Sequence, residues 1–378
     1  MKRCSNSPIK SVLHILEAVE GGTWQHLKDL VGGMDRARFS CAVALSFERG
    51  CVDRAETIAT FERMGATVYP LAMKRRVAPV ADLRALAQMV MLLRRVKPDM
   101  IHAHSSKAGL LGRVAAKLCN VPVVYTPHAF AFLMKQGVLR RSLYQRVERA
   151  AVKLTSAVIC LSREEVDAAA ALGYCPEQIH MIPNGIKFEG ARPLRVQEGG
   201  KLKLGFFGRS GRQKGDDTFV RLVAALQERG VAVEGYMYGV ATNSPRLLRF
   251  IHQSHAAAMV HLCGSCASAE VVEKMRDLDV IVMPSRWEGL PYVLLEAWLA
   301  GVPVAAYGTG GIKDVVVHGE SGLLAAPEDL RGLTTCVMQL RDAALRRRLA
   351  EGGRHALREF GLPQMVEQIE AVYASVIQ

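Results

Sequence analysis

The stretch that decides the fold reads Ser285-Arg286-Trp287-Glu288-Gly289-Leu290-Pro291-Tyr292-Val293-Leu294-Leu295-Glu296-Ala297. It follows the apolar run 280–283, which is typical of a short buried strand. We expect Pro291 in the first turn of a helix, because its missing N–H would have no partner there in any case. Gly301 is expected just beyond the end of that helix. Glu288 then lies on the loop before the helix, and Glu296 lies about one and a half turns inside it.

The expected start of this helix is suited to binding an anion, because the N–H groups of a first helical turn have no partner within the helix. The carboxylates of Glu288 and Glu296 on either side of that turn could accept hydrogen bonds from hydroxyl groups. A nucleotide sugar carries both phosphates and hydroxyls. For this pair alone the alternative is a solvated loop charge and an ordinary residue on the surface of a helix.

Strand-like and helix-like segments alternate along the chain, which predicts an α/β protein with parallel sheets. The expected strands cover residues 11–16, 41–46, 67–70, 100–103, 121–126 and 157–161 in the first half, and 202–207, 233–238, 260–262, 280–283 and 304–306 in the second. Residues 187–201 are rich in Gly, Pro and charge and are interpreted as a linker. We therefore predict two Rossmann-like domains, 1–186 and 187–362, that face each other across a central cleft. The predicted helix 363–378 could pack back on the first domain.

Composition narrows the class of protein and its surroundings. Of the 378 residues, 50% are hydrophobic and 22% charged, a globular balance. The nine cysteines are odd in number and lack the spacing of a disulfide framework, which favours a cytoplasmic protein. Residues 1–190 hold 27 Lys and Arg against 16 Asp and Glu, whereas residues 191–378 hold 22 against 20. The basic first half suggests a nucleic acid or an anionic membrane surface as a partner.

In each half of the chain, a glycine-rich loop follows the first expected strand. Gly208-Arg209-Ser210-Gly211-Arg212-Gln213-Lys214-Gly215 combines small residues, which let a backbone approach phosphate closely, with the cations Arg209 and Lys214. Gly21-Gly22 holds the matching place in the first half. For the 208–215 loop the alternative is a glycine-rich turn with two solvated cations. For Gly21-Gly22 it is a plain strand-to-helix turn.

Histidines lie at two further strand ends of the first half. His128 follows the strand 121–126, where loop residues often carry function, although a lone histidine is more often structural. His102 and His104 lie on one side of a strand, which could suggest a metal. No carboxylate or cysteine lies nearby in the sequence at ligand spacing, so we expect no metal there.

These stretches together resemble the retaining glycosyltransferases of family 4, which have the GT-B fold. The resemblance rests on Gly21-Gly22, Thr126-Pro127-His128, Pro183-Asn184-Gly185-Ile186, the Gly208–Gly215 loop, the Glu288/Glu296 pair and Gly308-Thr309-Gly310-Gly311. It covers nearly the whole chain. Lys187 departs from the pattern, because many relatives have an acid after Asn-Gly-Ile. The stretch 104–109 is similar to members that build surface polysaccharide.

The resemblance implies transfer of a hexose from a nucleotide-diphosphate sugar to a glycan or lipid-linked acceptor, with retention of configuration, in the synthesis of cell-surface polysaccharide or lipopolysaccharide. It implies catalytic roles for His128, Arg209, Lys214 and Glu288. It implies donor contacts for Gly21, Gly22, Asn184, Gly208, Gly289, Leu290, Pro291 and Glu296. It implies neither a metal nor another cofactor. The rivals are a GT-B sugar-nucleotide epimerase and a nucleic-acid-binding protein; the second lacks a recognisable motif and has only 6% aromatic residues.

Residues 135–153 combine apolar side chains at helical spacing with several arginines. A basic amphipathic helix of this kind can lie on an anionic membrane, and equally it can be a helix packed on its own domain with a solvated basic face. The first interpretation predicts a protein on the inner face of the cytoplasmic membrane.

Overall fold

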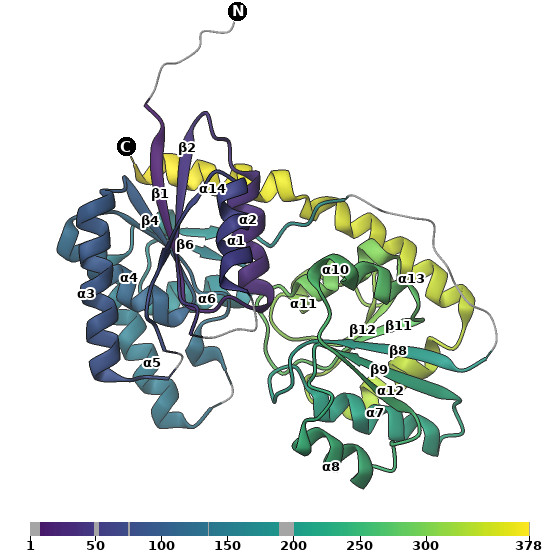
Figure 1. Cartoon of the computed structure of the whole chain (residues 1–378). Helices are drawn as coiled ribbons and strands as arrows, with labels where there is room; N and C mark the ends of the chain where they lie inside the picture. Colours follow the sequence, from purple (N-terminus) through teal and green to yellow (C-terminus); the bar gives the residue numbers. More distant parts are fainter. Residues whose placement is uncertain (1–7, 49–52, 75, 135, 189–199, 378) are drawn as a thin grey trace, which may run out of the picture. The chain divides into compact units, whose positions relative to one another are not determined.

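The computed structural model describes residues 8–48, 53–74, 76–134, 136–188 and 200–377. The chain forms two compact units (Figure 1). The N-terminal unit comprises Met1–Asn184 together with Leu362–Gln378, and the C-terminal unit comprises Gly185–Gly361. The boundaries expected from the sequence fall after residues 186 and 362. Most of the expected linker, residues 189–199, lies outside the described residues.

The described residues of the N-terminal unit build a seven-stranded sheet in the order β3-β2-β1-β4-β5-β6-β7, in which every pairing is parallel. Its strands are β1 (Lys10–Leu16), β2 (Phe39–Leu45), β3 (Thr67–Pro70), β4 (Met100–His104), β5 (Val123–Thr126), β6 (Ala157–Cys160) and β7 (Ile179–Met181). Its helices are α1 (Gly21–Gly33), α2 (Arg54–Arg63), α3 (Pro79–Val96), α4 (Ser106–Cys119), α5 (Val138–Ala151), α6 (Arg163–Leu172) and α14 (Leu362–Val376), with short 3₁₀ turns at Ala131–Leu133, Val152–Leu154 and Pro176–Gln178.

Helix α14 comes from the C-terminal end of the chain and completes the core of the N-terminal unit. Its apolar face packs with residues of β1, α1 and β2 in one buried cluster; the helix contributes Leu362, Met365, Val366, Ile369, Val372 and Tyr373. Gly33 of α1 permits the close approach, because a Cβ there would lie 2.9 Å from Cγ2 of Val366. Glu370 adds polar contacts by accepting from the N–H of Asp35 at 2.7 Å and from Arg38 at 2.9 Å.

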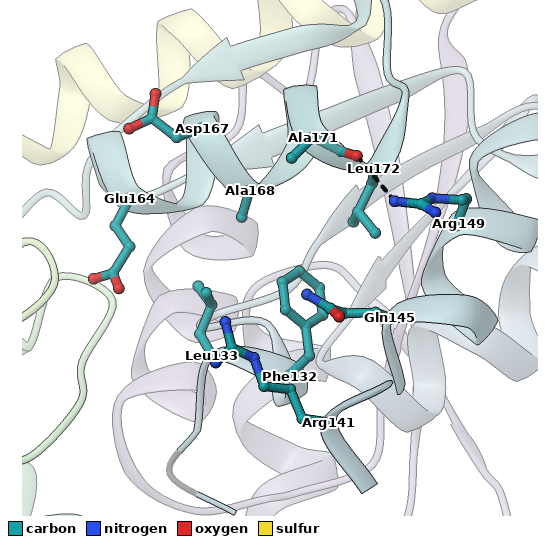
Figure 2. Close-up of a pocket in the computed structure, with 10 residues that line it drawn as sticks. All are labelled: Phe132, Leu133, Arg141, Gln145, Arg149, Glu164, Asp167, Ala168, Ala171 and Leu172. Carbon is teal, nitrogen blue, oxygen red and sulfur yellow. Dashed lines mark hydrogen bonds between the residues drawn. The ribbon is translucent and has the colours of Figure 1, made fainter. Parts of the chain in front are cut away.

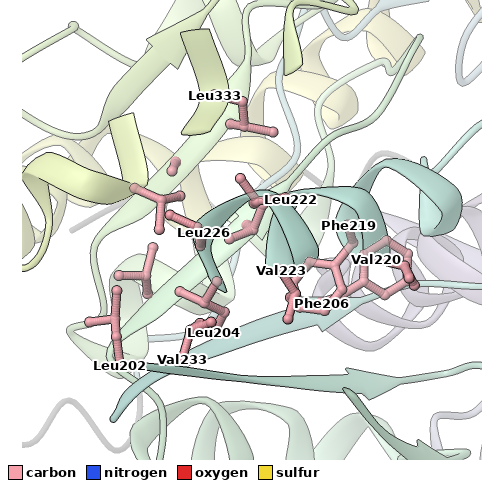
Figure 3. Packing of buried hydrophobic residues seen from close by; sticks show 14 of the residues in the cluster. Leu202, Leu204, Phe206, Phe219, Val220, Leu222, Val223, Leu226, Val233 and Leu333 are labelled. Atoms are coloured by element: carbon pink, nitrogen blue, oxygen red, sulfur yellow. The ribbon is translucent and has the colours of Figure 1, made fainter. Parts of the chain in front are cut away.

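The described residues of the C-terminal unit build a six-stranded parallel sheet in the order β10-β9-β8-β11-β12-β13. Its strands are β8 (Leu202–Phe207), β9 (Val233–Tyr238), β10 (Val260–Gly264), β11 (Val280–Met283), β12 (Val304–Tyr307) and β13 (Leu323–Ala325). Its helices are α7 (Asp216–Glu228), α8 (Pro245–Gln253), α9 (Val271–Arg276), α10 (Tyr292–Ala300), α11 (Ile312–Val315), α12 (Leu330–Gln339) and α13 (Ala343–Ala356), with 3₁₀ turns at Ser268–Glu270 and Leu357–Phe360. Phe219 and Val223 of α7 pack with Phe206 of β8 in its main apolar core (Figure 3).

The two sheets share one strand order over six strands, to which the N-terminal sheet adds β7 at one edge. In each, the strand order reverses beside the first strand of the unit: between β1 and β4, and between β8 and β11. Ligands of such sheets bind beside the carboxyl ends of the strands at this reversal. The predicted α/β fold with two Rossmann-like halves is confirmed.

Some expected boundaries are wrong at individual residues. The helix expected from about residue 24 begins at Gly21, and Pro291 is the N-cap of α10 with extended backbone, so that the first helical turn starts at Tyr292. Strands β7 and β13, of three residues each, were not expected, because so short a run has no readable periodicity. Among the described residues, no helix combines the length and the apolar character needed to cross a bilayer.

Candidate functional site

Three loops of the C-terminal unit carry sequence motifs on which the resemblance rests, and the first two of them hold the predicted site residues of that unit other than Glu296. They follow β8, β11 and β12, which are neighbours in the sheet, and they cover residues 208–215, 285–291 and 308–311. Because parallel strands end at the same edge, the three loops lie side by side. The sequence motifs therefore meet at the point where the strand order reverses.

An ion pair joins two of the predicted catalytic residues. Nζ of Lys214 lies 2.6 Å from Oε1 of Glu288, and the two side chains are only 21% and 7% exposed. The contact links the loop after β8 to the loop after β11 across 74 residues of sequence. A partly buried pair of this kind holds the ammonium in one place, with one face of the Lys214 side chain against Gly208, where a Cβ would lie 3.2 Å from Cγ of the lysine.

Arg286, which the sequence interpretation missed, holds these two loops together. Its guanidinium makes a two-pronged contact with Asp217 in the first turn of α7, at 2.9 and 2.8 Å, and donates to the carbonyl of Arg212 at 2.7 Å. Hydrogen bonding to Asp217 raises the pKa of Arg286. The backbone N–H of Arg286 also donates to Gln213 at 2.8 Å. Only the fold brings these residues together, so no spacing in the sequence could have revealed the pair.

The glycines after β12 let that loop approach the backbone of Glu288. Gly310 has φ +50°, and a Cβ at this position would overlap the carbonyl oxygen of Glu288. The N–H of Gly311 donates to the carbonyl of Gly289 at 2.7 Å. A larger residue at either position would displace the loop that carries Glu288.

Helix α10 places Glu296 as expected. Glu296 is the fifth residue of the helix and is half-buried, whereas Gly289, Leu290 and Pro291 before it are buried. Gly301 ends the helix in the left-handed conformation, with φ 75°. Arg209 lies exposed on the loop after β8. Glu288 thus lies on the loop and Glu296 inside the helix, as the sequence predicted.

In the N-terminal unit, Gly21 and Gly22 form the exposed start of α1, directly beyond the loop that follows β1, and Gly21 has φ 69°. His128 follows β5 in a strained turn: φ is +52° at His128 and +80° at Ala129. Strain of this kind persists where the surroundings enforce it, and it is frequent at functional sites.

Glu165 of α6 supports this turn and was not expected from the sequence. Its Oε1 accepts from the N–H of Ala129 at 2.5 Å, and its Oε2 accepts from the N–H of Leu161 at 2.7 Å. Burial raises the pKa of Glu165 to about 7, even though both hydrogen bonds favour the charged form. The turn that presents His128 is therefore held by a buried carboxyl group.

Five histidines gather at the carboxyl edge of this sheet. His104 is the last residue of β4. Its Nδ1 lies 3.1 Å from Nε2 of His128, and its Nε2 lies 3.3 Å from Nδ1 of His14 on β1. His26 of α1 lies 2.9 Å from Oδ1 of Asn184, one of the predicted donor residues. His102 contacts the hydroxyls of Tyr373 at 2.6 Å and Thr126 at 2.8 Å. His14 and His26 belong to no recognisable motif, so the sequence interpretation missed them.

These imidazoles are neutral, and all of them except the partly exposed His128 are fully buried. Burial lowers the pKa of His14 to about 3 and that of His26 to about 4. Burial, followed by the neighbouring histidines, lowers the pKa of His102, His104 and His128 well below the ordinary value. At neutral pH this cluster contributes hydrogen-bonding groups and lone pairs, but no positive charge.

A separate pocket of about 300 Å³ lies between α5 and α6 (Figure 2). Arg141, Gln145 and Arg149 line it from α5, whereas Glu164 and Asp167 line it from α6. Two carboxylates on one wall disfavour a phosphate. The pocket contains none of the predicted donor residues among its lining residues, so we do not assign the donor to it.

Comparison with known proteins shows the family. Residues 21–185 match the model of the glycosyl transferase 4-like domain, and residues 201–342 match that of the glycosyl transferases group 1. The 2-deoxystreptamine glucosyltransferase of Streptomyces kanamyceticus is 30% identical over 78% of this chain and 81% of its own length. The UDP-Gal:alpha-D-GlcNAc-diphosphoundecaprenol alpha-1,3-galactosyltransferase of Escherichia coli is 26% identical over 80% of this chain and 82% of its own.

Solved structures show the same fold at lower identity. Sucrose-phosphate synthase from Thermosynechococcus elongatus has a TM-score of 0.81 at 18% identity and covers 97% of this chain and 98% of its own. HepE from Anabaena, solved in complex with UDP-glucose, has a TM-score of 0.77 at 22% identity and covers 97% and 99%. With both family models matched in order and a relative at this level of identity, the chain belongs to the glycosyltransferases of the family 4 type, which have the GT-B fold.

Proposed function

We propose that this glycosyltransferase moves a hexose from a nucleoside-diphosphate sugar to a glycan or lipid-linked acceptor, with retention of anomeric configuration, during synthesis of a cell-surface polysaccharide. The single observation that carries the proposal is the Lys214–Glu288 ion pair at the strand-order reversal of the C-terminal unit. It places a cation that can bind a diphosphate beside a carboxylate that can accept hydrogen bonds from sugar hydroxyls.

The leaving diphosphate is the part of the reaction that most needs stabilisation, because negative charge develops on it as the bond to the sugar breaks. Lys214 supplies a positioned cation, and Arg209 on the same loop supplies a second that is exposed and able to reach a ligand. The backbone N–H groups at the start of α10 add partial positive charge. On this proposal Gly208, Gly289, Leu290 and Pro291 form the wall that the phosphates approach.

The polyol parts of the donor need hydrogen-bond acceptors. Glu296, half-buried in α10, accepts from the ribose hydroxyls, and Glu288 accepts from hydroxyls of the hexose. His128 in its strained turn contacts the transferred sugar, and Gly21, Gly22 and Asn184 contribute the remaining donor contacts of the N-terminal unit. We propose that a phosphate oxygen of the leaving group takes the acceptor's proton on the face it leaves, which gives retention without a protein nucleophile or a metal ion.

Relatives support the donor and acceptor classes. The Escherichia coli relative is named for a UDP-galactose donor and a diphosphoundecaprenol acceptor, and CapM of Staphylococcus aureus, 23% identical over 82% of this chain, is named for capsular polysaccharide biosynthesis. We propose a UDP-sugar as the first donor to test and a polyprenyl-diphosphate-linked sugar as the first acceptor.

A binding screen tests the donor site. The thermal midpoint of the whole chain is measured with UDP, GDP, ADP, TDP and CMP, for the wild type and for Lys214→Ala and Glu296→Ala. A ligand at 100 times its Kd adds about 2.7 kcal/mol. One diphosphate should stabilise the wild type, and both variants should lose the effect. Stabilisation by none of them, together with binding of single-stranded or duplex nucleic acid, would contradict the proposal.

A reaction assay then tests the chemistry. We expect an acceptor-dependent product whose anomeric configuration, determined by NMR, equals that of the donor, and we expect EDTA to leave the rate unchanged. Conversion of the donor without an acceptor would identify an epimerase instead.

Helix α5 favours a second property, attachment to an anionic membrane. Val138, Leu139 and Leu143 on this helix are 84%, 89% and 58% exposed. The exposed cations Arg140, Arg141, Arg146 and Arg149 and Lys153 lie on the same segment. Apolar side chains beside cations match an acyl-chain region beneath anionic headgroups.

Vesicle sedimentation tests this attachment. Vesicles that contain an anionic lipid should sediment the wild type at low salt and Leu139→Glu much less. Leu248→Glu, which changes an exposed leucine of α8 in the other unit, is the matched control and should sediment like the wild type. Equal sedimentation of all three proteins would contradict the role of α5.

A further inference from the structure

The first turn of α7 carries two adjacent carboxylates, Asp216 and Asp217, directly after the 208–215 loop. Acidic side chains stabilise the start of a helix. Here, however, they lie beside the loop to which the proposed function assigns the diphosphate, and a carboxylate repels a phosphate. Each of them is paired with an arginine from another segment. Asp217 pairs with Arg286, and Asp216 pairs with Arg246 at the start of α8.

Asp216 is fixed against the loop itself. Its side chain is completely buried, and its Oδ2 accepts from the N–H of Gly211 at 3.0 Å. Its Oδ1 accepts from the N–H of Asp217 at 2.8 Å. Gly211 lies between Arg209 and Lys214, the two cations that the proposed function assigns to the leaving diphosphate. The carboxylate of Asp216 therefore holds the middle of the loop in place and puts a negative charge next to it.

Arg246 offsets this charge from outside the loop. Its Nη1 lies 2.8 Å from Oδ2 of Asp216 and its Nη2 lies 3.2 Å from Oδ1, so the planar guanidinium meets both carboxylate oxygens. The two partners differ in burial, because the Arg246 side chain is 55% exposed whereas that of Asp216 is not exposed at all. Water can solvate Arg246 when Asp216 is neutralised, but it cannot solvate Asp216 when Arg246 is removed.

Compensation matters at this edge of the sheet because it holds further carboxylates. Glu288 lies on the neighbouring loop, and Glu296 lies inside the helix that follows it. A diphosphate is itself an anion, and it binds among such groups only where cations offset them. Arg246 supplies one of these cations from α8, outside the three loops that carry the sequence motifs.

We propose that Arg246 is a positioning residue of the donor site, which acts on the donor through Asp216. It keeps the carboxylate that fixes the 208–215 loop from repelling the diphosphate. Together the two side chains give the N–H of Gly211 an acceptor without adding net charge. The inference rests on the proposed function, because it requires that a diphosphate binds at this loop.

The test measures the Kd of the whole chain, by calorimetry at pH 8, for the nucleoside diphosphate found in the screen, with UDP first. Arg246→Gln leaves the buried carboxylate without its cation and should weaken binding more than about 10-fold. Arg246→Lys keeps the charge and should recover most of this loss. A role that depended on the two-pronged geometry alone would leave Arg246→Lys as weak as Arg246→Gln.

A double variant separates compensation from direct contact with the donor. Asp216→Asn removes the charge but keeps an oxygen for the N–H of Gly211. In the Asp216→Asn background, Arg246→Gln should change the Kd less than about 2-fold, because no buried charge remains to be offset. If Arg246 touched the diphosphate itself, its loss would weaken binding in both backgrounds, and the inference would be wrong. This comparison also holds if Arg246→Gln alone fails to fold, which circular dichroism shows.

Arg249→Gln is the matched control. Arg249 is exposed on the same helix and donates to the carbonyl of Pro245 in that helix, at 3.2 Å. The substitution removes the same charge and should leave the Kd unchanged. A wild type that binds the diphosphate no better than folded Arg246→Gln would overturn the inference and leave the proposed function standing. A wild type that binds none of the diphosphates would overturn the proposed function, and the inference with it.

Discussion

The two units share a strand order but differ in the chemistry at the edge where it reverses. In the C-terminal unit this edge carries charged pairs: Lys214 with Glu288, and Arg286 with Asp217. In the N-terminal unit the corresponding edge carries buried histidines and the carboxyl group of Glu165, whose pKa is raised to about 7. The topology fixes where a ligand can bind, and the loops decide whether the site holds charges or neutral hydrogen-bonding groups.

The difference follows from solvent access. The four charges of these C-terminal pairs persist because each faces a partner of opposite sign and keeps some exposure to solvent. His14, His26, His102 and His104 of the N-terminal unit are fully buried, where a charge would lose its hydration, so burial holds them neutral.

The largest effect is expected when the charged unit loses its positioned cation. Lys214→Ala should lower kcat/KM by about 10²–10³-fold, or about 3–4 kcal/mol, because the proposed mechanism places this cation where negative charge develops. Steady-state kinetics with the donor found in the screen measures this. Lys201→Ala is the matched control. Lys201 lies just before β8, at the end of the strand opposite to the loop of Lys214, and its side chain is 61% exposed. The substitution removes the 2.9 Å ion pair between Lys201 and Glu234. An equal loss in both variants would show that position relative to the loops does not matter.

A smaller effect is expected at Glu165 in the neutral unit. Its folded pKa of about 7 lies above the ordinary value of 4.5, so the folded chain retains a proton that the unfolded chain loses, and stability falls as pH rises through this range. Glu165→Gln removes the titration. The free energy of unfolding of the wild type, relative to this variant, should fall by about 3 kcal/mol from pH 4.5 to pH 7.5.

Urea titrations of both proteins at several pH values measure this difference, and the histidines, present in both, cancel. A difference that does not change with pH would mean that the N-terminal unit accepts a charge beside Ala129, and the contrast between the two units would weaken.

The smallest effect is expected from the glycine that brings two loops of the charged unit together. Gly310→Ala should cost about 2 kcal/mol, since it combines a left-handed φ with overlap at the carbonyl of Glu288. Gly319→Ala measures the cost of the left-handed φ alone. Gly319 also has a positive φ, +81°, but a Cβ there would meet nothing within 4 Å. Thermal midpoints and donor KM should both change more for Gly310→Ala. If the two variants behave alike, the close approach to Glu288 is unimportant.

Much of the fold was predictable because the strands are apolar runs between clear breaks. Residues 67–70, 202–207, 233–238 and 280–283 are strands with the expected limits. The placement of Glu288 and Glu296 was also predictable, since Pro291 and Gly301 mark the limits of α10.

The contacts that organise the site were not predictable. Arg286 meets Asp217 across 69 residues, and His26 meets Asn184 across 158. None of these four side chains stands at a spacing that identifies its partner, and each becomes meaningful only when the sheet is formed. The roles of the site residues in catalysis stay predictions that the experiments above address.

The return of α14 to the N-terminal unit has a consequence for synthesis on the ribosome. Residues 185–361 form one uninterrupted unit and can fold once they have emerged, but the earlier unit lacks part of its core until residues 362–376 follow. At about 5–20 residues per second, the apolar surface around Val12, Leu30 and Phe39 waits roughly 10–40 s for its cover. The first unit to be made is therefore the last to be finished, and it is the one that would depend on a chaperone in the interval.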